Sequence, residues 1–88
     1  MSDEVVYQRN AMFRMQFEKA QESYVLLFPE GMVKLSESAA EILLQFEQPS
    51  PVSAAISRLE AKFPGVSLAQ DVAEFVEVAC DKKWLESC

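Results

Sequence analysis

The spacing of apolar residues changes at Ser36, and this change constrains the fold more than any other feature of the chain. Before Ser36, in segment 12–17, apolar and polar residues alternate, which is the pattern of a strand with one buried face. After it, the apolar residues of 39–46 recur every third or fourth position, as on one face of a helix. Strand-like and helix-like halves in that order predict an α+β domain.

Three short strands are expected in the first half. Segments 12–17 and 24–28 are separated by the polar stretch 18–22, which is typical of a hairpin loop. Proline and glycine at 29–31 favour a tight turn, because proline fixes the first turn position and glycine tolerates positive φ. Segment 32–35 then forms the third strand of an antiparallel sheet.

Three helices are expected in the second half. Ser36 is a suitable N-cap for the first, and Pro51 stands in the first turn of the second, which Pro64-Gly65 ends. Ser67 is the expected N-cap of the third. The predicted order is a three-stranded sheet followed by three helices, similar to a winged helix-turn-helix, in a single domain of 1–88 whose residues 1–10 are flexible.

The composition argues against nucleic-acid binding and against catalysis. Eight Lys plus Arg against fourteen Asp plus Glu give a net charge of −6, and the third helix carries acidic residues that phosphates would repel. The chain has no histidine, which removes the commonest general base and the commonest transition-metal ligand. Carboxylates at helical spacing, such as Glu37 with Glu41, are interpreted as a solvated face. We therefore expect no enzyme activity, no metal and no cofactor.

The two cysteines and the apolar segments point to a cytoplasmic protein. Cys80 and Cys88 match no common metal spacing, and Cys80 falls beside an apolar stripe, where a small core residue is expected. No apolar run approaches the eighteen residues of a membrane span, and the acidic start leads into no signal sequence. Reduced thiols in the cytoplasm are therefore the simplest interpretation.

A small sheet offers a binding mode that needs no reactive group. A three-stranded sheet has two edge strands with unpaired backbone groups, and the short segment 32–35 would lie beside an apolar helix. Such an edge can take an extended peptide as an additional strand. An edge protected by its own chain is an equally consistent interpretation of these residues. The apolar stripe 68–79 is expected to be mostly core, with one residue at its rim left for a ligand.

Several segments resemble the PqqD family, the small peptide chaperones of pyrroloquinoline quinone (PQQ) biosynthesis. They are Ala20-Gln21-Glu22-Ser23, Pro29-Glu30-Gly31-Met32-Val33-Lys34-Leu35, Glu37-Ser38-Ala39-Ala40-Glu41-Ile42-Leu43, Phe63-Pro64, Asp71-Val72-Ala73-Glu74-Phe75 and Ala79-Cys80-Asp81-Lys82-Lys83-Trp84. The resemblance runs from about Arg14 to Trp84. It implies a recognition element for ribosomally made, modified peptides (a RiPP recognition element).

The resemblance also implies partners and a site. A PqqD-like chain would bind the precursor peptide PqqA and present it to the radical S-adenosylmethionine (SAM) enzyme PqqE; the alternative is recognition of another modified peptide. The residues implied in peptide binding are Met32, Val33, Lys34 and Leu35 on the third strand, and Val72, Phe75, Val76 and Ala79 across a cleft. Lys34 would attract an acidic peptide or simply extend along the sheet margin. We expect a monomer in solution, with a strand-exchanged or crystal dimer as the alternative.

Overall fold

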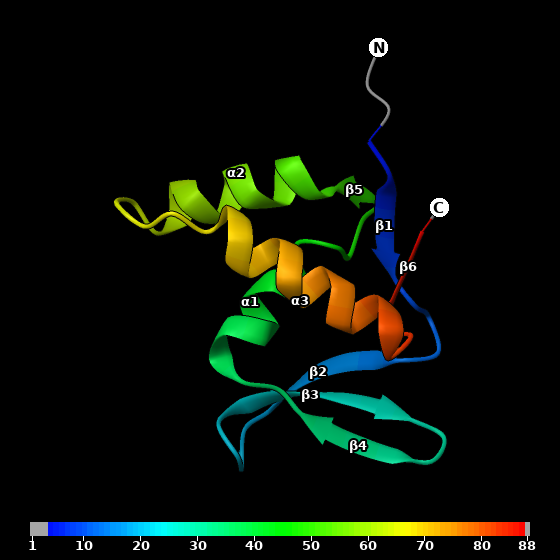
Figure 1. Ribbon diagram of the computed structural model, residues 1–88. Coiled ribbons are helices and arrows are strands. Elements are labelled where there is room, and N and C mark those ends of the chain that lie inside the picture. The colour runs from blue at the N-terminus through cyan, green and yellow to red at the C-terminus, as the bar shows by residue number, and fades with distance from the viewer. Residues whose placement is uncertain (1–3, 88) are drawn as a thin grey trace.

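The larger sheet contains the three strands that alternation predicts. The computed structural model describes residues 4–87, and in it β2 (Arg14–Glu18), β3 (Ser23–Phe28) and β4 (Gly31–Lys34) form an antiparallel sheet in the order β2-β3-β4 (Figure 1). The register aligns Met15, Leu26 and Val33 across the three strands. All three pack on the hydrophobic core, so this face of the sheet is the buried one.

The three expected helices are present, and the first begins as predicted. They are α1 (Glu37–Leu44), α2 (Val52–Lys62) and α3 (Ala69–Asp81). Ala39 N–H donates to Ser36 Oγ at 3.2 Å, which makes Ser36 the N-cap of α1. Ser67 does not cap α3: Leu68 occupies the cap position, and its N–H donates to the Glu60 carboxylate on α2 at 2.8 Å. The start of α3 therefore has no side-chain cap, and the Glu60 contact ties the cap residue to α2.

A second antiparallel sheet corrects the predicted element order. It consists of β1 (Val6–Arg9), β5 (Ser50–Pro51) and β6 (Leu85–Ser87) in the order β5-β1-β6. One of its strands therefore precedes β2, one separates α1 from α2, and one follows α3, so the sheet is not simply followed by three helices. The likeness to a winged helix-turn-helix stays a prediction.

The start of the chain contributes a strand to the second sheet. Within the segment 1–10, where flexibility was expected, residues 6–9 form β1, whose neighbours on both sides are β5 and β6. The strand sequences of the second sheet show no alternation of apolar and polar residues, because these strands are only two to four residues long. Expectations for residues 1–3 and for Cys88 fall outside the described residues.

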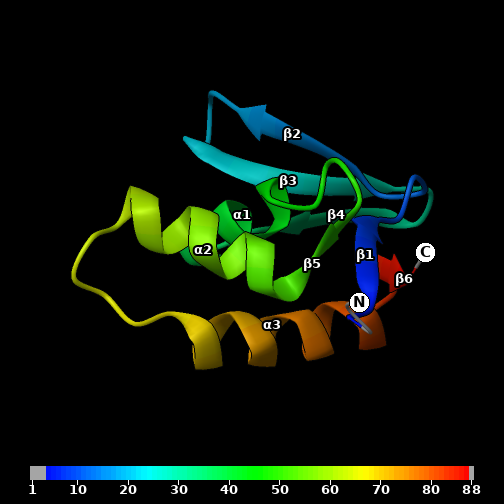
Figure 2. The same ribbon diagram turned by 90° about the horizontal axis from the view of Figure 1, so that it is seen from above.

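The core lies between the larger sheet and the three helices. Its fully buried members include Leu26 from β3, Leu43 from α1 and Phe46, whose ring meets that of Tyr7 edge-on at 6.5 Å. In Figure 1 the larger sheet lies below the helices, and Figure 2 shows that α3 lies toward the β4 edge of this sheet, away from β2. No helix within residues 4–87 has both the length and the apolar character needed to cross a membrane.

Candidate functional site

Strand β4 is an edge strand with one long side unpaired. In the described part of the chain its only hydrogen-bonded neighbour is β3. The Leu35 N–H donates to the Tyr24 carbonyl at 2.9 Å, which sets the phase of the antiparallel pairing. Because bonded and non-bonded pairs alternate along such a ladder, Val33 bonds to β3, whereas the N–H and C=O groups of Met32 and Lys34 point to the free side.

The side chains of β4 divide between two faces. Val33 packs on the core, Met32 is 48% exposed, and Lys34 is also exposed. Leu35, directly after the strand, is buried. Of the four residues implied in peptide binding on this strand, Met32 and Lys34 therefore offer backbone groups at the edge, while Val33 and Leu35 hold the strand in place.

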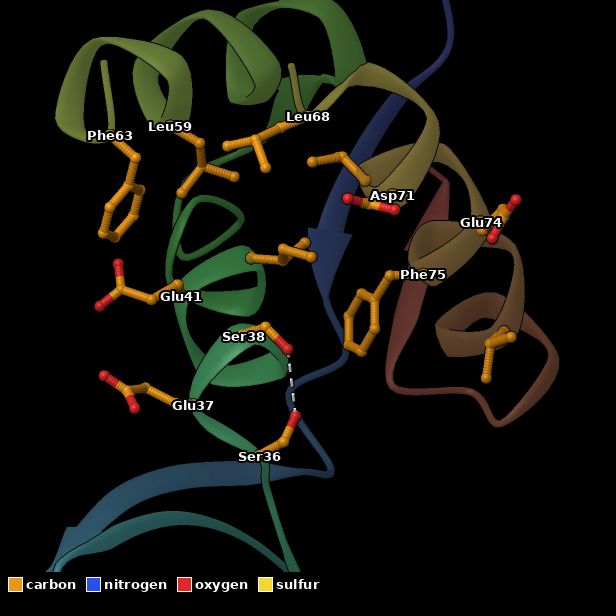
Figure 3. Close-up of a pocket in the computed structure, with 13 residues that line it drawn as sticks. Ser36, Glu37, Ser38, Glu41, Leu59, Phe63, Leu68, Asp71, Glu74 and Phe75 are labelled. Atoms are coloured by element: carbon orange, nitrogen blue, oxygen red, sulfur yellow. Dashed lines mark hydrogen bonds between the residues drawn. The ribbon is translucent and has the colours of Figure 1, made fainter. Parts of the chain in front are cut away.

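An apolar groove begins where β4 ends. It has a volume of about 800 Å³ and lies between α1 and α3, with the end of α2 closing one side (Figure 3). Its apolar lining comes from all three helices and the loop between α2 and α3, and consists of Ile42, Leu59, Phe63, Leu68, Val72, Phe75 and Val78. Ser36, two residues beyond β4, lines it too. A peptide strand on the β4 edge would therefore lie next to an apolar surface.

One face of α3 packs in the core and another lines the groove. Val72, Val76 and Ala79 are at most 5% exposed and belong to the core. Of these three, Val72 also reaches the groove, whereas Val76 and Ala79 do not line it. Phe75, the fourth residue implied on this helix, is half-buried and lines the groove; its ring lies 6.3 Å from that of Trp84.

Residues not expected from the sequence complete the α3 side of the groove. Val78 is 48% exposed, and Leu68 lies just before the helix. Positions 68, 71, 75 and 78 recur at intervals of three and four, which places them on one helical face beside the core face. The spacing of these four positions was the sequence signal for a second binding face on α3, but Asp71 interrupts the apolar character of that face.

Apart from the hydroxyl groups of Ser36 and Ser38, the polar lining of the groove is acidic. Glu37 and Glu41 lie on the α1 side, and Asp71 and Glu74 on the α3 side (Figure 3). Lys62 Nζ lies 2.7 Å from Glu41 Oε2 and forms its ion pair. None of the residues that line the groove is Lys or Arg.

Neither the cysteine nor the carboxylates of residues 4–87 show an activated thiol or a metal-binding cluster. Cys80, the cysteine within residues 4–87, is half-buried, and burial raises the pKa of its thiol, with the Asp81 carboxylate adding to the rise. A raised pKa keeps the thiol protonated and weakly nucleophilic near neutral pH. The described residues contain no group of three or more Cys, Asp or Glu side chains placed to hold a metal ion.

Comparison with protein families gives a match over most of the chain. The family model described as Coenzyme PQQ synthesis protein D (PqqD) matches residues 23–85, which includes β3, β4 and all three helices. The chain is 48% identical over 75 residues to the "PqqA binding protein" of Pseudomonas fluorescens Pf-5, covering 84% of this chain and 82% of the relative. It is 40% identical over 87 residues to the "PqqA binding protein" of Kluyvera intermedia, covering 98% and 95%.

A solved structure has the same fold. The solution NMR structure of the PqqD truncation of Methylobacterium extorquens PqqCD superimposes with a TM-score of 0.75 at 22% identity, covering 92% of this chain and 88% of that one. That protein is described as a functional, stand-alone RiPP recognition element. The α+β arrangement described above is therefore shared with a solved recognition element.

Proposed function

Because this chain belongs to the PqqD family, we propose that it binds the precursor peptide PqqA without modifying it and presents the peptide to the radical SAM enzyme PqqE. Relatives at 40–48% identity carry the name "PqqA binding protein", which supports PqqA as the ligand. The role in PQQ biosynthesis follows from the family, and a cytoplasmic location is part of the proposal.

The observation that carries this proposal is the unpaired side of β4 next to the apolar groove. The backbone groups of Met32 and Lys34 can pair with an extended peptide, each hydrogen bond adding about 0.5–1.5 kcal/mol net. Alternate peptide side chains would then face the groove, where Phe75 and Val78 offer apolar contacts. After ordering costs, four or five peptide residues held in this way reach micromolar affinity, about −8 kcal/mol.

Strand addition also explains how a bound peptide stays available to an enzyme. The added strand covers the β4 edge and itself becomes the new edge of the sheet, so its outer backbone groups remain open. Peptide residues beyond the short strand lie outside the sheet altogether. A partner enzyme can reach them without displacing the peptide from this protein, which is what a presenting role requires.

Calorimetric titration tests the proposal most directly. The PqqA peptide of Pseudomonas fluorescens Pf-5 is titrated into the protein alone and into the protein mixed with PqqE, and a peptide of the same composition in scrambled order serves as the control. We expect binding of PqqA in the micromolar range and no binding of the scrambled peptide. Absence of PqqA binding under both conditions would contradict the proposal.

The alternative is a recognition domain for another ribosomally made peptide, which would use the same edge and groove. An apolar groove beside a sheet edge selects a class of peptide rather than one sequence. The same geometry is therefore consistent with a precursor peptide other than PqqA. Genes for PqqA and PqqE beside the gene of this protein favour the first proposal. A neighbouring gene for a different precursor peptide, together with calorimetric binding of that peptide and not of PqqA, favours the second.

A further inference from the structure

We propose that the groove between α1 and α3 selects a peptide segment in which Lys or Arg stands beside apolar residues. The inference rests on the proposed function, because it concerns the chemistry of the peptide bound there. It comes from the combination of apolar side chains, which form the floor of the groove, with carboxylates on its α1 and α3 sides, which form its walls (Figure 3).

The floor of the groove requires apolar side chains of the peptide. Phe63 and Val78 are 40% and 48% exposed, and Phe75, which also lines the groove, is half-buried. Covering this surface removes apolar area from water at about 25 cal/mol per Å². A wholly charged segment would leave it exposed and would bind poorly.

The carboxylates on the walls of the groove favour a peptide that carries positive charge. Glu37 lies on the α1 side of the groove and Asp71 on the α3 side, and no Lys or Arg of residues 4–87 lies within ion-pair distance of either. Glu74 accepts a hydrogen bond from the neutral Gln70 at 2.9 Å, so its charge is not neutralised either. Of the four carboxylates that line the groove, Glu41 alone has a cationic partner within residues 4–87, which is Lys62.

The rest of the chain adds to the negative electrostatic potential of the groove. The net charge is −6, and the exposed Lys34 lies outside the groove, in a neighbouring hollow that Glu37 and Glu41 also line. A peptide carboxylate in the groove would meet like charge along both sides, whereas a Lys or Arg would be attracted by the carboxylates there. Apolar contacts therefore provide affinity, and the carboxylates select which apolar segment enters.

Charge-neutralised variants test the selection. In E37Q/D71N two of the three groove carboxylates that lack a cationic partner are replaced, one on each side, and in the control E77Q/D81N the same charge is removed from the part of α3 that faces away from the groove. Binding of the Pseudomonas fluorescens PqqA peptide is measured by calorimetry in 50 mM and 500 mM NaCl, after circular dichroism has shown that each variant is folded. At 50 mM we expect E37Q/D71N to bind about 3- to 10-fold more weakly than the unmodified protein and the control to stay within about twofold. At 500 mM the difference shrinks, since salt screens these charges.

A peptide variant separates this inference from the proposed function. Replacing every Lys and Arg of the PqqA peptide by Gln should weaken binding to the unmodified protein about 3- to 10-fold and to E37Q/D71N by less than about twofold. If PqqA does not bind the unmodified protein at either salt concentration, the proposed function itself fails. If PqqA binds and E37Q/D71N behaves as the control does, only the selection by charge is overturned.

Discussion

The substitution Lys34→Pro tests strand addition at a single backbone group. The N–H of Lys34 points to the free side of β4, so proline removes a donor that the fold does not use. Proline is tolerated on an edge strand where the N–H faces solvent, and the preceding Val33 is already in the extended conformation that precedes proline. The protein should therefore remain folded.

The expected loss of affinity follows from one hydrogen bond and its partner. The bond itself contributes about 0.5–1.5 kcal/mol, and the peptide carbonyl left without a donor costs about 1–3 kcal/mol if it stays buried. These two contributions overlap, so we expect a total of about 1.5–3 kcal/mol. At about 1.4 kcal/mol for each factor of ten, PqqA should bind Lys34→Pro about 10- to 150-fold more weakly.

Lys34→Ala is the matched control, because it removes the same side chain and keeps the N–H. Calorimetry with the PqqA peptide should find its affinity within about threefold of the unmodified protein. Urea unfolding of both variants shows whether the fold is intact. If Lys34→Pro is folded and binds PqqA as well as Lys34→Ala does, the peptide does not pair with this edge. Val33→Pro would be no substitute, because the Val33 N–H bonds to β3 within the sheet.

Further predictions concern stability, the thiol and assembly. Leu43→Ala removes a fully buried side chain and should lower the free energy of unfolding by about 2–5 kcal/mol in urea titration; a loss below about 1 kcal/mol would contradict the core described here. Ser36→Ala removes the N-cap of α1 and should cost about 1 kcal/mol in the same assay, and no change would mean that the 3.2 Å contact contributes nothing. In a variant that lacks Cys88, Cys80 should react with iodoacetamide at pH 8 more slowly than free cysteine, because burial and then Asp81 raise its pKa, and Asp81→Asn should speed the reaction; equal rates for Cys80 and free cysteine would contradict this. Light scattering at micromolar concentration should give the mass of a monomer, and a dimer mass would point to strand exchange.

Local patterns were sufficient to predict the larger sheet and the first helix. Segments 12–17, 24–28 and 32–35 lie within one or two residues of β2, β3 and β4, because the strands are consecutive, joined by short turns and buried on one face. Ser36 was recognised as a cap because its side chain bonds within its own helix. In each of these cases the partners are close in sequence.

The second sheet could not be predicted in this way. Tyr7 pairs with Ser87 on one side and with Ser50 on the other, so both partners are far away along the chain. Strands of two to four residues show no period, and β5 contains Pro51, which usually argues against a strand. Only tertiary pairing makes these segments strands.

The edge position of β4 was predictable from the sequence, whereas the groove face of α3 was not. The regular apolar stripe of α3 marks its core face, and Val76 and Ala79 are therefore buried rather than placed along the groove. The groove face contains Asp71 and the exposed Val78, a mixture that sequence patterns interpret as solvated surface. This face becomes part of a groove only when α1 is packed opposite.

Amide hydrogen exchange, followed by NMR on the labelled protein with and without the PqqA peptide, tests strand addition most directly. The amides of Met32 and Lys34 point to the open side of β4 and should exchange rapidly in the free protein. On addition of the peptide both should become protected, while the amide of Val33, already bonded to β3, should change much less. Saturating binding that leaves the Met32 and Lys34 amides unprotected would contradict the account.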